Sequence, residues 1–169
     1  MRSSLGRGTR FSLRVPLVLP GVALERRAPL RPRIFEDIAA LRVLVIEDDP
    51  MVRDALVSLL VSWRVDVAVA DGLATALALP KSAAAPDVLV ADYRLREGEN
   101  GIDVIRQLRA SVGQPIPACL ISGDTDASLM QAGAAASLTL LHKPVRPAKL
   151  RSLLRRLAHV GQVDEEQAV

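Results

Sequence analysis

The chain has 169 residues, half of them hydrophobic, and a formal net charge of +3. This length allows one ordinary domain with a short appendage and excludes two full domains. Cys119 is the only cysteine, so an intrachain disulfide is excluded and a reducing compartment is expected.

The charge is unevenly distributed along the chain. Residues 1–40 contain eight arginines against three acidic residues, whereas residues 161–169 contain three acidic residues and no arginine or lysine. A basic arm is typical of proteins that bind nucleic acid or membranes, but these arginines are scattered and few aromatic residues accompany them. We therefore expect no nucleic-acid partner.

An apolar stretch near the N-terminus raises the question of a membrane segment. Arg14, Pro16 and Pro20 interrupt this stretch, which covers residues 11–24. It is shorter than the roughly 20 apolar residues of a membrane span and lacks the unbroken apolar core of a signal peptide. We therefore expect no membrane contact and a cytoplasmic location.

From residue 41 onward, short apolar runs alternate with helical patterns. The apolar runs predict strands at 41–46, 64–70, 87–92, 117–122 and 137–141. Helices are predicted at 50–61, from Asp71 to near Pro80, at 100–110, at 124–132 and at 147–160. Asp49 followed by Pro50 is typical of a helix cap and a first helical residue.

Five strand–helix units in strict alternation predict an α/β domain with one parallel sheet and helices on both faces. Because crossover connections are right-handed, few strand orders remain, and the flavodoxin-like order 2-1-3-4-5 is usual at this length. We therefore expect a doubly wound (βα)5 domain, preceded by an irregular N-terminal arm.

Polar residues stand at the carboxyl ends of four predicted strands, namely Glu47, Asp48, Asp49, Asp92, Ser122 and Lys143. In a doubly wound sheet these ends form one rim, where ligands bind. A phosphate site after the first strand would need glycines. Acids at that position instead favour a hard divalent cation such as Mg²⁺.

Each of these residues also has an ordinary interpretation. Asp49 is most simply the helix cap, and acids such as Glu47 and Asp48 are common in surface loops. A serine or lysine at a strand end is usually a turn residue or a solvated side chain. Asp92 is less ordinary, because it ends an apolar strand and precedes a loop with two glycines.

Together these residues resemble the receiver domain of bacterial two-component response regulators, over about residues 41–160. The resemblance lies in the acidic pair of VLVIEDDP, Asp92 in VLVADYRL, Ser122 in LISG, Lys143 in HKP, and Gly101 after the phosphorylation loop.

The resemblance implies a role for each matched residue. Asp92 is expected to accept a phosphoryl group from a phosphohistidine of a histidine kinase or a histidine phosphotransfer protein. Lys143 is expected to pair with that group as a positive charge. Ser122 is expected to hydrogen-bond one of its oxygens and so to switch a protein-interaction surface. The expected Mg²⁺ ligands are Glu47, Asp48, Asp92 and the backbone carbonyl of Arg94.

The resemblance implies two further features near the predicted lysine. The Lys143–Pro144 peptide bond is expected to be cis. Many receivers carry an aromatic residue three positions before the lysine, which reports phosphorylation to partners. Leu140 occupies that position here, so we expect the output surface to be read differently or more weakly.

Residues 1–18 resemble the end of a histidine-kinase ATP-binding domain, through Gly6, Gly8, Thr9 and Phe11. We expect this remnant to bind no ATP, because the rest of that domain is missing. The expected order is a remnant at 1–18, a linker at 19–40, the receiver at 41–160 and an acidic tail at 161–169.

That order is typical of the C-terminal receiver of a hybrid histidine kinase. The nine residues after 160 are too few for a DNA-binding output domain, so a downstream protein partner is expected. We expect no independent kinase activity from the chain, only Mg²⁺-dependent self-phosphorylation and dephosphorylation at Asp92.

Three other interpretations remain open. In the first, the chain would be a receiver-like docking module that is never phosphorylated. In the second, it would be a fragment of a hybrid sensor histidine kinase, and the kinase activity would belong to the parent protein. The third is a metal-dependent phosphatase, but such enzymes place the nucleophile after the first strand in a D-x-D pattern, and residues 48–50 read DDP. A docking module usually loses an acid or the lysine, and this chain retains them.

Overall fold

The computed structural model describes residues 2–4, 8–10, 12, 38–79, 85–123 and 127–166. The chain divides into two units, Met1–Pro32 and Arg33–Val169, and each is described by itself. In the first unit, β1 (Arg2–Ser4) and β2 (Gly8–Arg10) pair as antiparallel strands. The arm expected to be irregular therefore contains a short hairpin. Most of the expected linker lies outside the described residues.

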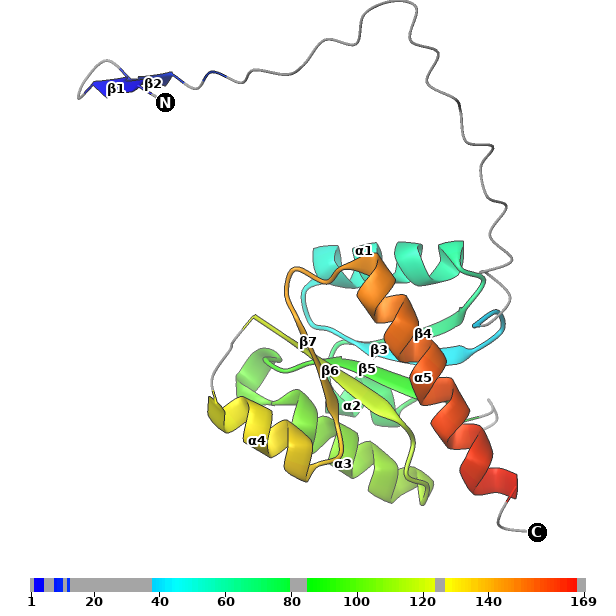
Figure 1. The fold of residues 1–169 in the computed structure, drawn as a ribbon. Coiled ribbons are helices and arrows are strands. Elements are labelled where there is room, and N and C mark those ends of the chain that lie inside the picture. Colours follow the sequence, from blue (N-terminus) through cyan, green and yellow to red (C-terminus); the bar gives the residue numbers. More distant parts are fainter. Residues whose placement is uncertain are drawn as a thin grey trace, which may run out of the picture. The chain divides into compact units, whose positions relative to one another are not determined.

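The second unit contains one parallel sheet of five strands (Figure 1). The strands are β3 (Arg42–Ile46), β4 (Asp66–Ala70), β5 (Val88–Asp92), β6 (Ala118–Ser122) and β7 (Thr139–His142). Their spatial order is β4-β3-β5-β6-β7, and every neighbouring pair is parallel. Numbered within this sheet, the order is 2-1-3-4-5, which confirms the predicted flavodoxin-like fold.

Helices cover both faces of the sheet (Figure 1). They are α1 (Pro50–Ser62), α2 (Leu73–Leu77), α3 (Gly101–Val112), α4 (Ala127–Ala135) and α5 (Pro147–Glu166). Side chains from α2, α3 and α4 share one core, and side chains from α1 and α5 share the other. No helix in the described part of the chain is long and apolar enough to cross a membrane.

The strand side chains alternate between these two cores. Leu44 and Ile46 of β3 belong to the core under α2, α3 and α4, whereas Val43 and Val45 belong to the core under α1 and α5. All five residues of β5 are buried. A central strand covered on both faces must be apolar throughout, which explains the continuous apolar runs in the sequence.

Side-chain caps fix the starts of two helices that border the carboxyl edge of the sheet. Asp49 accepts a hydrogen bond from the backbone N–H of Met51 at 2.8 Å, as predicted for the start of α1. Asn100 accepts one from the N–H of Asp103 at 2.9 Å at the start of α3. Each cap satisfies a backbone donor that the helix itself leaves free.

The second helix of the receiver differs from its prediction. It begins at Leu73 with Gly72 as its cap, and it ends at Leu77 instead of continuing to the proline. The Asp71 side chain does not cap it, because this carboxylate accepts a hydrogen bond from the Thr75 hydroxyl at 2.6 Å. The Asp71 carboxylate thus binds the Thr75 side chain in place of a backbone N–H at the start of the helix.

Three other boundaries also differ from expectation or were not tested. Ile38 has an exposed fraction of 2% and packs into the core, so core residues begin before the expected start at 41. The last helix, α5, continues to Glu166 and so includes residues assigned to the acidic tail. The expected start of the fourth helix at Asp124 lies outside the described residues.

Candidate functional site

The carboxyl ends of four strands meet at one edge of the sheet. Glu47 follows β3, Asp92 ends β5, Ser122 ends β6 and Lys143 follows β7. Among the described residues, Glu47, Asp92 and Ser122 are the buried polar or charged side chains, with exposed fractions of 2%, 7% and 2%. The structure therefore brings the predicted acids, serine and lysine to one edge.

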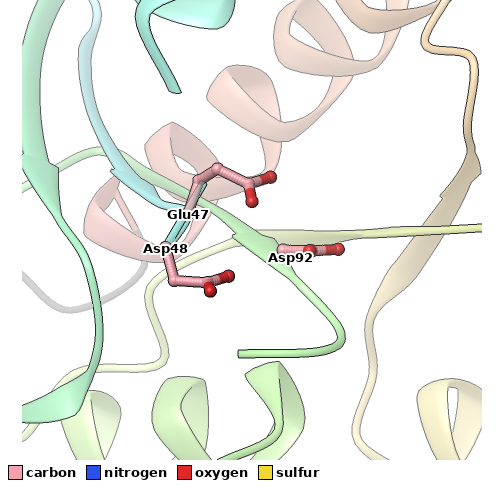
Figure 2. A group of neighbouring side chains, drawn as sticks. All are labelled: Glu47, Asp48 and Asp92. Carbon is pink, nitrogen blue, oxygen red and sulfur yellow. The ribbon is translucent and has the colours of Figure 1, made fainter. Parts of the chain in front are cut away.

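Glu47, Asp48 and Asp92 form a group of three carboxylates (Figure 2). Each carboxylate offers one oxygen atom to the group, and these three oxygen atoms all lie within 4.8 Å of one another. Negative charges this close repel one another, and a cation among them removes that cost. Because every donor is an oxygen, the group fits a hard cation such as Mg²⁺.

Local backbone contacts hold Glu47 in place after its strand ends. Its N–H donates to the Ala70 carbonyl at 3.1 Å, which continues the β3–β4 ladder by one residue. Its own carbonyl accepts a hydrogen bond from Nη1 of Arg53 at 3.0 Å. The buried carboxylate also accepts from the N–H of Asp49 at 3.3 Å. The strand therefore carries Glu47 into a buried position that an ordinary loop acid would not occupy.

Lys143 bridges two of the three acids. Its Nζ donates to Oδ2 of Asp92 at 3.0 Å and to Oε2 of Glu47 at 3.4 Å. Its backbone N–H donates to the Ser122 carbonyl at 2.8 Å, and the peptide bond to Pro144 is cis, as expected. Burial acts to lower the pKa of Lys143, but its hydrogen bond with Asp92 and the attraction of both carboxylates raise it overall. The lysine is therefore positively charged at neutral pH.

The backbone around Asp92 is fixed by close packing against α3. The Gly101 N–H donates to the Tyr93 carbonyl at 2.9 Å. A Cβ atom added at Gly101 would lie 2.2 Å from the carbonyl oxygen of Asp92 and 2.8 Å from Cδ1 of Leu120. Position 101 therefore accepts only glycine without a shift of the backbone that carries Asp92.

Two other residues singled out in the sequence, Arg94 and Leu140, also lie in the described part of the domain. Arg94 is exposed and forms a backbone bridge with Asn100, and the role of its carbonyl as a metal ligand stays a prediction. Leu140 lies in β7 and is partly buried against the core under α2, α3 and α4. A leucine there packs as an ordinary core residue.

One residue at this edge, Arg96, was not predicted from the sequence. Its Nε donates to Oδ2 of Asp48 at 3.1 Å, and its Nη2 donates to the backbone carbonyl of the same residue at 3.1 Å. Arg96 lies in a charged loop, in the short 3₁₀ helix η2 (Arg96–Gly98). A loop arginine is usually solvated, so only the three-dimensional structure reveals this partner.

The buried acid Glu47 makes the expected cation site sensitive to pH. Burial raises the pKa of Glu47 above its ordinary value of 4.5, the charge of Asp92 raises it further, and Lys143 partly offsets both. Because its pKa is raised on folding, protonated Glu47 contributes to the stability of the folded state. This contribution is lost as pH rises through the folded-state pKa and Glu47 ionises. A cation bound by Glu47 would need the ionised carboxylate, so protons and Mg²⁺ would compete for it.

We therefore expect the increase in melting temperature caused by Mg²⁺ to be largest at neutral pH. It should decline on acidification at a pH above the usual titration range of a glutamate. Thermal unfolding with and without Mg²⁺ across a pH series measures this. In the Glu47→Gln variant the residual Mg²⁺ effect should decline only at lower pH. An identical pH profile in both proteins would show that Glu47 does not control the competition.

The family model for the response regulator receiver domain matches residues 43–155. The DNA-binding response regulator MtrA of Mycolicibacterium smegmatis is 34% identical over 124 residues, which cover 71% of this chain and 53% of that protein. The chain thus spans about half the length of the curated relatives that it matches.

Solved structures give the same result for the fold. A response regulator receiver protein from Pseudomonas putida has a TM-score of 0.60 and 32% identity, and the match covers 70% of this chain and 98% of that one. The chemotaxis protein CheY4 of Vibrio cholerae has a TM-score of 0.63 and 25% identity, with coverage of 70% and 99%.

Proposed function

Because the chain belongs to the response regulator receiver domain family, we propose that it accepts a phosphoryl group on Asp92 in a two-component signalling pathway. The observation that supports this most strongly is the position of Lys143, whose Nζ lies 3.0 Å from Asp92 and 3.4 Å from Glu47. It places a fixed positive charge beside a buried carboxylate at the carboxyl edge of a doubly wound sheet, where such folds bind ligands.

In the proposed reaction, a carboxylate oxygen of Asp92 attacks the phosphorus of a phosphohistidine. A P–O bond forms, the P–N bond breaks, and the histidine leaves as imidazole. The product on Asp92 is an acyl phosphate. Phosphoryl transfer needs positioning and charge stabilisation more than covalent chemistry from the protein. Burial of Asp92 at the end of a rigid central strand supplies the positioning.

The charge on the transferred group is offset by two cations in this proposal. Glu47, Asp48 and Asp92 would hold Mg²⁺, with the backbone carbonyl of Arg94 as a further ligand, and the ion supplies positive charge to the phosphoryl oxygens when bound. Lys143 provides the second charge from the chain itself. Ser122, buried at the end of β6, is proposed to hydrogen-bond a phosphoryl oxygen and so to report phosphorylation.

The proposed partners are a histidine kinase or histidine phosphotransfer protein as the phosphoryl donor, and a downstream protein, in the cytoplasm. The resemblance of residues 1–18 to the end of a kinase ATP-binding domain supports a place within a hybrid histidine kinase. The matched relatives are instead named as DNA-binding response regulators. Detection of a kinase domain in the same natural protein would decide for the hybrid arrangement.

Incubation with radiolabelled acetyl phosphate tests the proposed function. We expect label on the intact protein in the presence of Mg²⁺ and none after a chelator is added. A folded protein that takes up no label with Mg²⁺ would contradict the proposal and favour the alternative of a docking module that is not phosphorylated.

Replacement of Lys143 by alanine separates phosphorylation from cation binding. We expect the rate of labelling to fall by about a hundredfold, as when one donor aimed at developing charge is removed. Mg²⁺ affinity should be unchanged or higher, because a positive charge leaves the acidic group. Lys149→Ala is the matched control, since Lys149 is exposed on α5. Equal loss of Mg²⁺ affinity and labelling would show that Lys143 supports the cation site instead.

A further inference from the structure

Arg96 binds Asp48, whereas Lys143 binds the other two carboxylates of the acidic group, Glu47 and Asp92. The guanidinium contacts Asp48 through both Nε and Nη2, at 3.1 Å each. This forked geometry holds the side chain and the backbone carbonyl of Asp48 together. A guanidinium presents its N–H donors in a fixed planar fork, whereas an ammonium group is a point charge on a flexible stem.

The three acids are thus divided between two side-chain cations from this chain. Lys143 forms ion pairs with Asp92 and Glu47, and Arg96 forms one with Asp48. Lys143 is needed next to the phosphoryl group in the proposed function. Arg96 carries no role there, yet it pairs with a carboxylate that belongs to the expected cation site.

We propose that Arg96 competes with the divalent cation for Asp48, so that cation binding requires Arg96 to leave this carboxylate. The inference rests on the proposed function, because it concerns the same cation site. It assigns to Arg96 the role of setting the cation concentration at which the receiver becomes ready for phosphorylation.

The surroundings of Arg96 allow this movement. Its side chain is 70% exposed, whereas that of Asp48 is 19% exposed. The loop itself is held by backbone hydrogen bonds, from Leu95 N–H to the Glu99 carbonyl and from Glu99 N–H to the Arg96 carbonyl, each 3.1 Å long. The arginine side chain can therefore withdraw while the backbone of the loop stays in place.

The charge of Arg96 also acts on a second acid, Asp71. The hydrogen bond from Thr75 lowers the pKa of Asp71, and the charges of Arg53 and Arg96 lower it further. Asp71 is exposed at the end of β4, next to the rim. Arg96 therefore stays near a second negative charge when it leaves Asp48.

Mn²⁺, which also takes oxygen ligands, provides a direct test, because the free ion is measured by electron paramagnetic resonance without any phosphorylation. Arg96→Ala should bind Mn²⁺ about two- to fivefold more tightly than the natural chain, which corresponds to an exposed ion pair worth up to about 1 kcal/mol. The difference should shrink as salt is added, since the competing charge is exposed.

Arg106→Ala is the matched control. Arg106 also has a side chain that is 70% exposed and forms one ion pair, with Asp103 on α3, so the same charge is lost away from Asp48. Its Mn²⁺ affinity should equal that of the natural chain. Arg96→Lys should bind Mn²⁺ with an intermediate affinity, because it keeps the charge but loses the fork. Thermal unfolding without metal checks that each variant is folded.

Unchanged or weaker Mn²⁺ binding by folded Arg96→Ala would overturn the inference, and weaker binding would show that Arg96 positions Asp48 for the cation. These outcomes are separable from failure of the proposed function. If the natural chain is labelled by acetyl phosphate but Arg96→Ala binds Mn²⁺ no more tightly, only the competition is wrong. If the natural chain is not labelled, the proposed function itself fails.

Discussion

Replacement of Asp92 by asparagine is expected to abolish phosphorylation while the domain stays folded. Asparagine has nearly the same shape, and its amide oxygen can still accept the hydrogen bond from Nζ of Lys143, which Asp92 accepts at 3.0 Å. The carboxylate nucleophile is lost, however, and an amide forms no acyl phosphate. Labelling by acetyl phosphate with Mg²⁺ should therefore fall to background.

The effect on stability should be small by comparison. Loss of the ion pair with Lys143 destabilises the folded state, and relief of the repulsion from Glu47 stabilises it. We expect the free energy of unfolding in urea to change by no more than about 2 kcal/mol, because the two effects oppose each other. Asp66→Asn is the control, since Asp66 is exposed at the other end of the sheet. If Asp92→Asn were labelled at the rate of the natural chain, Asp92 would not be the phosphoryl acceptor.

Gly101→Ala is expected to have the largest effect on stability. The added Cβ would lie 2.2 Å from the backbone oxygen of Asp92, a distance that rotation of a flexible side chain cannot relieve. The free energy of unfolding should fall by about 3 kcal/mol, the upper part of the usual range for overpacking. The same displacement moves Asp92, so labelling should also fall.

Gly133→Ala provides a matched comparison within the same domain. Gly133 lies in α4, and a Cβ added there meets no atom within 4 Å. A glycine replaced by alanine inside a helix normally stabilises the fold by about 1 kcal/mol. Urea unfolding of the two variants should therefore give opposite signs. If Gly101→Ala were as stable as the natural chain, the close packing of α3 against Asp92 would be wrong.

The sheet was predictable because each central strand is buried on both faces. Apolar runs such as that of β5, with all five residues buried, are visible in the sequence without any tertiary information. The strict alternation with helices then leaves one usual strand order. The convergence of Glu47, Asp92, Ser122 and Lys143 follows from that order, because all four lie at strand carboxyl ends.

Features that depend on particular side-chain contacts were not predictable. The start of α2 moved because Asp71 binds the Thr75 hydroxyl, a choice between two partners that the sequence leaves open. Ile38 precedes β3, and only its burial shows that it belongs to the core. Arg96 reaches Asp48 across 48 residues of sequence, and a loop arginine has many possible partners.

The most direct test of the central claim is chemical identification of the phosphorylated residue. Reduction of an acyl phosphate with borohydride converts a phosphorylated aspartate to homoserine, which peptide mass spectrometry locates. After incubation with acetyl phosphate and Mg²⁺, we expect homoserine at position 92 and at no other acid of the group. Reduction at Glu47 or Asp48 in place of Asp92, or label without any reducible residue, would contradict the account.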